Sequence, residues 1–150
     1  MKILVAVLSL LVVSINSFAL DIKVNSIIKI KNNIRKTEIT RISYAEERNG
    51  LYQMVKEDTP ESKMFLEAVK DDLTPEGVTL FNKDRIGFFK LNTVEIRGYL
   101  VDCNSKLIAP VYSIDKYENT IIMSKTFKPN FRKTQPQFGE DSVVKSSCKR

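Results

Sequence analysis

The chain has 150 residues, and its 24 Lys and Arg against 18 Asp and Glu give a formal net charge of +6. It contains no histidine, which removes the commonest general base and metal ligand, and two cysteines alone cannot complete a zinc site. We therefore expect no enzyme, no metal and no cofactor.

The acidic residues are interspersed among the basic ones, which is typical of an ordinary solvated surface. A moderate surplus of positive charge could still favour acidic glycans, acidic proteins, anionic lipids or nucleic acid. We expect a protein or an acidic glycan as the partner and no nucleic acid, and we leave the oligomeric state open.

The first predicted element is an export signal over residues 1–19. Lys2 precedes an apolar run over residues 3–13, and Ser17 and Ala19 of the Ser17-Phe18-Ala19 segment place small side chains where a signal peptidase reads them. Cleavage there would leave residues 20–150 as a single exported domain. We expect this domain in the periplasm, on the cell surface or secreted.

A membrane anchor is the alternative interpretation of the same segment. A spanning helix needs about 20 mainly apolar residues, and Ser14 and Asn16 interrupt this run earlier. We therefore expect no membrane span after the signal is removed.

Short strands are predicted for most of the mature chain. Residues 22–31 are rich in Val and Ile and punctuated by Lys, which suits an edge or half-exposed strand. Residues 38–56 predict a hairpin, because Asn49-Gly50 separates two β-prone runs. Closely spaced strands with short polar turns then predict an antiparallel meander. These further strands are residues 78–81, 86–91, 93–103, 107–114 and 120–125.

One amphipathic helix is predicted between these strands, over residues 60–72. Thr59-Pro60-Glu61 supplies a capping residue, a proline suited to the first turn and an acid near the positive helix end. We expect Thr74-Pro75-Glu76-Gly77 to end this helix. The apolar stripe that would pack onto the sheet consists of Met64, Phe65, Ala68 and Val69.

A second, short helix is predicted for residues 136–148, with Glu140 and Asp141 near its start and basic residues near its end. Two cysteines of a small exported domain are normally joined, so we expect a Cys103–Cys148 disulfide. Chain entropy predicts a stabilisation of about 4 kcal/mol from such a bond. A reactive thiol is the alternative, but no histidine is present to activate one. The predicted fold class is α+β: an antiparallel meander, a disulfide-tethered C-terminal helix and one additional amphipathic helix.

The C-terminal third combines several features in a fixed order. These are Asp102-Cys103 closing a strand, a Tyr-containing turn and strand over residues 117–124, Phe131, Pro136, and a short helix ending in Cys148. Over about residues 94–148 the chain thereby resembles the surface-adhesin protein E-like family of exported bacterial proteins. The resemblance implies a bent antiparallel sheet with a helix tethered to one face, and a surface or periplasmic protein that binds host matrix proteins. It assigns no ligand-binding residue, and residues 20–80 lie outside it.

Two basic groupings are candidates for a binding surface. One consists of Lys29, Lys31, Arg35 and Lys36. The other also carries aromatic residues and is our candidate patch: Lys125, Phe127, Lys128, Phe131, Arg132 and Lys133. The alternative interpretation of the patch is a solvated loop whose aromatic rings pack under the terminal helix.

The function that we expect is recognition of a protein or a glycan outside the cytoplasm, including host matrix components. The alternative is a periplasmic inhibitor or a toxin-neutralising, immunity-like protein, which the size and the charge fit equally well.

Overall fold

The computed structural model describes residues 22–43 and 49–149, which form two compact units, each with its own hydrophobic core. The predicted signal peptide lies outside the described residues, and the predicted single domain over 20–150 stays a prediction. The division between the units falls within three strands of the sheet. In the described chain the first unit holds residues 22–40, 98–111 and 128–149, and the second holds residues 41–43, 49–97 and 112–127.

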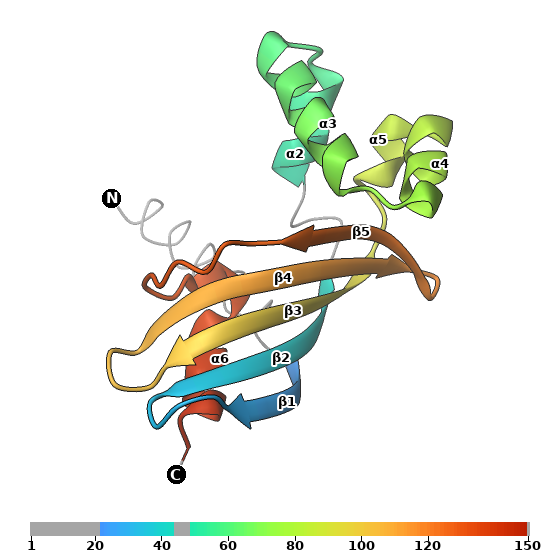
Figure 1. The fold of residues 1–150 in the computed structure, drawn as a ribbon. Coiled ribbons are helices and arrows are strands. Elements are labelled where there is room, and N and C mark those ends of the chain that lie inside the picture. The colour runs from blue at the N-terminus through green and yellow to red at the C-terminus, as the bar shows by residue number, and fades with distance from the viewer. Residues whose placement is uncertain (1–21, 44–48, 150) are drawn as a thin grey trace, which may run out of the picture. The chain divides into compact units, whose positions relative to one another are not determined.

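Five strands form an antiparallel meander in the order β1-β2-β3-β4-β5, with β1 and β5 at the two edges (Figure 1). This confirms the predicted α+β class and the predicted meander. The strands are β1 (Ile22–Lys29), β2 (Ile34–Ser43), β3 (Thr93–Asp102), β4 (Leu107–Tyr117) and β5 (Thr120–Thr126).

The helices lie in two groups along the chain, one before β3 and one after β5. They are α2 (Asn49–Lys56), α3 (Pro60–Asp72), α4 (Pro75–Lys83), α5 (Arg85–Phe88), the 3₁₀ helix η3 (Pro136–Phe138) and α6 (Glu140–Ser147). The predicted helix over 60–72 is confirmed. The predicted C-terminal helix over 136–148 is confirmed at α6, but residues 136–138 form a separate 3₁₀ helix, with Gly139 in a left-handed conformation between the two. In the described part of the chain, none of the helices has the length and hydropathy needed to cross a bilayer.

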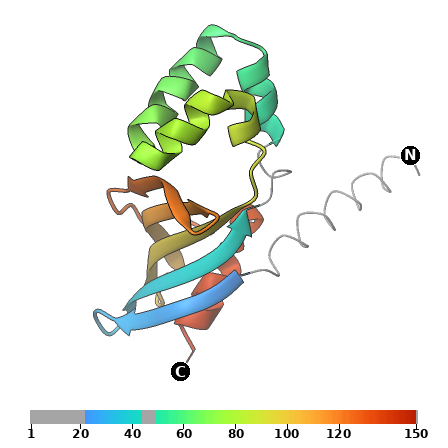
Figure 2. The same ribbon diagram turned by 90° about the vertical axis from the view of Figure 1, so that its right-hand side faces the viewer.

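The first core lies between α6 and one face of the sheet (Figure 2). Thr37 and Ile39 alternate with outward residues of β2, and both are fully buried. The Thr37 and Ser147 hydroxyls form a 2.7 Å hydrogen bond, which joins β2 to the end of α6. The buried members of this core are Ile39, Tyr99, Val101, Ile108, Val143 and Val144.

The second core is rich in aromatic rings. Phe88 packs edge-on against both Phe81 and Phe89, with ring centroids 5.6 and 5.5 Å apart. Such geometry aligns ring edges with ring faces and adds to the free energy of burial. Val69 of α3 and Ile122 of β5 complete the buried set.

The predicted hairpin over 38–56 is wrong, because its second half is helix α2. Tyr52 and Val55 both pack against the second core, and a spacing of three residues puts them on one side of a helix. Asn49-Gly50 therefore begins a helix instead of turning a hairpin.

The strands predicted over 78–81 and 86–91 are also wrong, because this stretch contains α4 and α5. The Thr74 hydroxyl accepts a hydrogen bond from the Gly77 amide at 3.1 Å, and the Asp84 carboxylate accepts one from the Gly87 amide at 2.9 Å. Both side chains are N-caps, which favour helix over strand. Thr74-Pro75 therefore starts a second helix directly after the first one ends.

The predicted apolar stripe of α3 is wrong at Met64, which is 76% exposed, and at Ala68, which is also exposed. Ser62 and Val69 are the buried residues of this helix, and Phe65 contacts the core between them. Phe65 is three residues after Ser62 and four before Val69, so the three residues lie on one face of the helix. Met64 lies on the opposite, solvated face.

The outer edge of β5 is covered by the junction between α3 and α4. Leu73 forms an antiparallel bridge with Met123, and the Thr74 amide donates to the Ile122 carbonyl at 3.1 Å. The Thr74 hydroxyl donates to the Ile121 carbonyl at 2.6 Å. This edge of the sheet is therefore covered over residues 121–123.

Gly77 allows this close approach, because a Cβ atom there would lie 1.9 Å from the Ile122 carbonyl oxygen. We predict that Gly77→Ala lowers the free energy of unfolding by about 1–3 kcal/mol, since the backbone must move to relieve the contact. Chemical denaturation followed by circular dichroism measures the change. The neighbouring exposed Glu76→Ala is the control and should cost less than about 1 kcal/mol. Equal losses in both variants would contradict the steric argument.

Candidate functional site

The predicted disulfide is confirmed: Cys103 and Cys148 are bonded, with their Cα atoms 5.4 Å apart. Cys103 directly follows β3, and Cys148 directly follows α6. The Cys103 amide also donates to the Asn33 carbonyl at 2.8 Å, which ties the β1–β2 turn to the same point. The bond therefore holds the C-terminal helix against the sheet, as expected.

Asp102, next to the disulfide, organises the turn that follows β3. Its carboxylate accepts hydrogen bonds from the Asn33 amide group at 3.1 Å and from the Asn104 backbone amide at 2.9 Å. These bonds hold the pKa of Asp102 below its ordinary value, chiefly through Asn33, although partial burial opposes the shift. Asp102 thus serves the geometry of the turn.

Arg132, a member of the candidate patch, is engaged within the fold. It makes two hydrogen bonds to the Glu140 carboxylate, at 2.6 and 3.0 Å, and the Glu140 side chain is fully buried. These hydrogen bonds raise the pKa of the Arg132 guanidinium. The Gln135 amide donates to the same carboxylate at 2.8 Å, and the backbone of Arg132 pairs with Ile108 in both directions at 2.9 Å. Arg132 therefore anchors its segment.

Three other patch residues of the first unit face solvent on this anchored segment. Lys128, Phe131 and Lys133 are all exposed, and the Phe131 side chain is 39% exposed. Part of the Phe131 ring is therefore accessible to solvent. An aromatic ring held open to water between two lysines is suited to contact with a partner.

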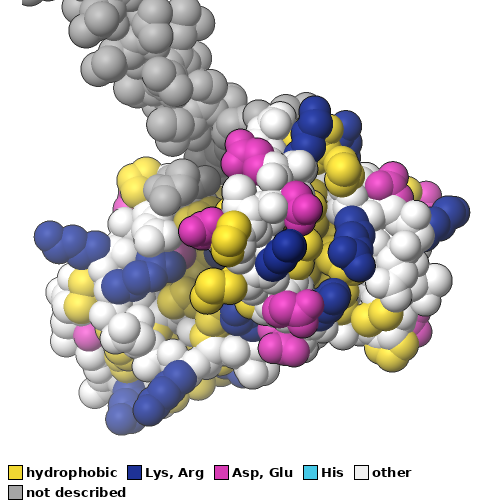
Figure 3. Space-filling model, turned by 90° about the horizontal axis from the view of Figure 1, so that it is seen from above, with side chains coloured by type: hydrophobic (Ala, Val, Ile, Leu, Met, Phe, Trp, Pro, Cys, Tyr) yellow, Lys and Arg dark blue, Asp and Glu magenta, His cyan; other side chains and the backbone are white. Residues whose placement is uncertain are grey.

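The remaining two patch residues, Lys125 and Phe127, belong to the second unit. The Lys125 ammonium lies 3.5 Å from the Asp72 carboxylate and 5.5 Å from the centroid of the exposed Phe127 ring. Its charge is partly balanced inside the unit. In the view of Figure 3, basic, acidic and hydrophobic side chains are intermixed over the visible surface, in keeping with their interspersion along the sequence.

A surface pocket of about 320 Å³ lies in the first unit, beside the anchored segment. Thr134, the residue after Lys133, donates a hydrogen bond to the Asp141 carboxylate within it. The sequence carried no signal for this pocket, because its lining comes from three separate segments. The lining residues are Lys106, Thr134, Asp141, Val144 and Lys145.

A buried ionic cluster in the second unit was not found by sequence reasoning. The Glu95 carboxylate bonds Arg41 of β2 at 3.2 Å and also bonds Arg97 of its own strand. Arg41 and Glu95 are each 5% exposed. The only sequence signal is the opposite charge at alternate positions 95 and 97, which share one face of β3. Burial away from solvent makes this cluster part of the fold.

Within residues 22–43 and 49–149, no group of three or more Cys, Asp and Glu side chains is arranged to hold a metal ion. Comparison with known proteins finds no family model, curated protein or solved structure that matches this chain. The resemblance to the surface-adhesin E-like family therefore stays a prediction.

Proposed function

We propose that the chain is an exported recognition protein that binds an acidic partner through Phe131 and its flanking lysines. The observation that carries this proposal is the exposed Phe131 ring on a segment fixed by the Arg132–Glu140 pair. A rigid backbone has little conformational entropy to lose on binding, so an exposed ring on it can contribute more of its contact energy.

Two further observations support the proposal. The Cys103–Cys148 bond is of the kind that persists in oxidising compartments, which suits an exported protein. Lys128 and Lys133 flank the ring, and the adjacent pocket contributes Lys106 and Lys145. Carboxylate or sulfate groups of an extracellular protein or glycan match this surface, and host matrix components provide both.

The test is binding of the purified, oxidised protein to immobilised matrix glycoproteins and to a sulfated glycosaminoglycan, measured by surface plasmon resonance. The informative variant is Lys128→Glu/Phe131→Ala/Lys133→Glu, which removes the ring and reverses two charges. We expect at least a tenfold loss of affinity, because exposed aromatic anchors dominate such contacts.

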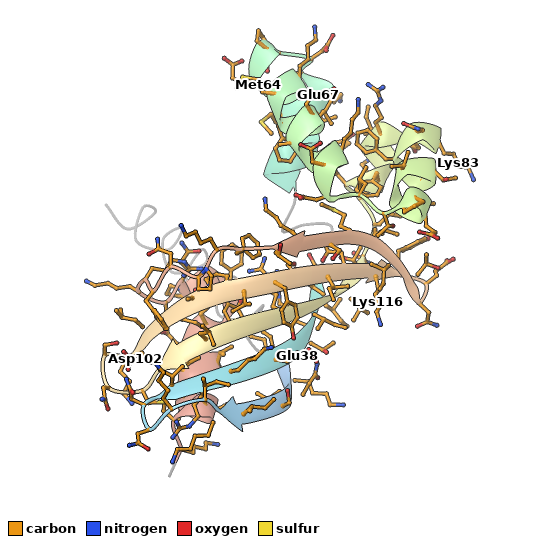
Figure 4. All side chains as sticks on the ribbon, viewed as in Figure 1. Glu38, Met64, Glu67, Lys83, Asp102 and Lys116 are labelled. Atoms are coloured by element: carbon orange, nitrogen blue, oxygen red, sulfur yellow. A yellow bond between two sulfur atoms is a disulfide. The ribbon has the colours of Figure 1, made fainter. Side chains whose placement is uncertain are left out.

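The matched control is Lys63→Glu/Met64→Ala/Lys83→Glu, which likewise removes one exposed apolar side chain and reverses two charges on the helices of the second unit. Met64 and Lys83 are labelled in Figure 4. It should bind like the unchanged protein. Equal losses of affinity in the two variants would show that binding depends only on the net charge of the protein, which would contradict the proposal. Binding to a protein from a periplasmic extract, with none to matrix ligands, would favour the inhibitor-type alternative.

A further inference from the structure

The two edges of the sheet differ in how they are protected. Backbone and side-chain bonds from Leu73 and Thr74 cover β5, whereas β1 is the last strand at the opposite edge (Figure 1). In the part of the chain that the structure describes, no strand pairs with the outer side of β1. An uncovered strand edge presents backbone donors and acceptors to which another strand can add.

The side chains of β1 alternate between the two faces of the sheet. Ile22 and Val24 pack against the first core, whereas Asn25 hydrogen-bonds the outward Glu38 and Thr40 side chains of β2. Even-numbered positions of β1 therefore lie on the α6 face, and odd-numbered positions lie on the opposite face.

This alternation places both lysines of β1 on one face of the sheet. Ile28 lies on the α6 face and is 53% exposed, although it is a large hydrophobic residue. Lys23 and Lys29 lie on the opposite face with Ile27, which is 43% exposed. Exposed isoleucines on an open edge are usually avoided, because they promote strand addition.

Charge indicates what kind of strand would fit. Lys23, Lys29 and Lys31 form no ion pair with any residue that the structure describes. Arg35 is different, because its guanidinium donates to the carbonyls of the β1–β2 turn at 3.0 Å. Glu38, labelled in Figure 4, is the only acid of β2. One face of the edge therefore carries both lysines of β1 beside the exposed Ile27, and the other face carries no charged residue of β1.

A second copy of the chain meets a charge conflict when its β1 strand pairs symmetrically about Ser26. Antiparallel pairing of two β1 strands about Ser26 would place Lys23 of one copy opposite Lys29 of the other. Like charges directly opposite each other destabilise a strand pair. An incoming strand with acidic side chains on that face would instead neutralise both lysines.

We propose that β1 is a docking edge for an extended segment of an acidic protein, in which acidic and aliphatic residues alternate. The segment would add to the sheet as a sixth strand. Its acidic side chains would lie beside Lys23 and Lys29, and its aliphatic side chains beside Ile28. This surface is separate from the Phe131 surface and goes beyond the function proposed above.

The experiment uses the oxidised full chain and a synthetic eight-residue peptide of alternating Glu and Val with blocked termini. Binding is measured by calorimetry at low and high salt, and the bound edge is located by amide hydrogen exchange. We expect the peptide to protect amides of β1 and its affinity to fall with salt, because ion pairs at a surface are screened. Ile28→Thr/Lys29→Glu should weaken binding at least tenfold, while threonine preserves the preference for strand.

Ile121→Thr/Lys116→Glu is the matched control, because these two residues are cross-strand partners in the β4–β5 pair and the same two types of change are made. It should bind the peptide normally, and so should the Phe131 triple variant, which separates failure of this proposal from failure of the first. Three results would overturn the docking edge: undiminished binding by the Ile28/Lys29 variant, equal binding of a peptide with four Val followed by four Glu, or a dimer that the Ile28/Lys29 variant abolishes.

Discussion

Replacing Cys148 with serine should lower the free energy of unfolding by about 4 kcal/mol. The bond closes a loop with a sequence separation of 45 residues, and its loss releases the entropy of that loop in the unfolded chain. In a domain of this size the melting temperature should fall by about 10 °C or more. Thermal and urea denaturation of the oxidised protein and the variant measure both quantities.

The double variant Cys103→Ser/Cys148→Ser separates the bond from the substitution itself. It should be about as stable as the single variant, because the bond is already absent there. Reduction of the unchanged protein should reproduce most of the loss. A melting curve that stays the same after Cys148→Ser would contradict the view that this bond holds α6 in place.

Replacing Arg132 with methionine should cost about 3 kcal/mol, because it leaves the Glu140 carboxylate buried without its cation. Glu140 is fully buried, and the Gln135 amide would be its main remaining donor. Methionine keeps much of the arginine's apolar stem, so the change tests the charge more than the packing. Equilibrium denaturation in urea measures the loss.

Glu140→Gln is the complementary variant, and we expect a smaller cost, about 1–2 kcal/mol. The arginine side chain is 31% exposed and can turn toward water, and glutamine can still accept from the Gln135 amide. The double variant Arg132→Met/Glu140→Gln should be more stable than Arg132→Met alone. If Glu140→Gln were less stable than Arg132→Met, the buried carboxylate without its cation would not be the main cost of breaking the pair.

The strand pattern of the sheet was largely predictable from local sequence. The predicted strands over 93–103, 107–114 and 120–125 correspond to β3, β4 and β5, and 22–31 contains β1. Short polar turns separate these runs, and antiparallel neighbours need only such turns. The order of the strands in the sheet therefore followed from their order in the chain.

The helices between β2 and β3 were only partly predictable. Thr59-Pro60-Glu61 predicts α3 correctly, yet the same signature at Thr74-Pro75-Glu76, where we expect only the end of that helix, begins α4. Short apolar runs such as residues 78–81 fit a strand or a helix equally well. In the structure this stretch is helical, and Phe81 of α4 and Phe88 of α5 pack against each other in the aromatic core.

The candidate patch shows why the type of a residue does not establish whether its side chain is free to bind a partner. Arg132 and Phe131 are neighbours in the sequence, but the structure uses Arg132 to neutralise the buried Glu140 and leaves Phe131 exposed. The partner carboxylate is eight residues away, on α6. Nothing in the local pattern indicates which of the two basic neighbours, Arg132 or Lys133, takes this role.

By itself the sequence determined the α+β class, the meander and the Cys103–Cys148 bond. It also determined two helices, one over residues 60–72 and one near the C-terminus. The strands and helices follow from residue periodicity and capping residues, which act locally. The bond follows from the number of cysteines, because two cysteines allow only one pairing. Only the tertiary structure decided which sheet edge is covered and which lysines lack an acid. Both depend on contacts between residues far apart in the chain, such as Thr74 with Ile121, and local patterns do not encode them.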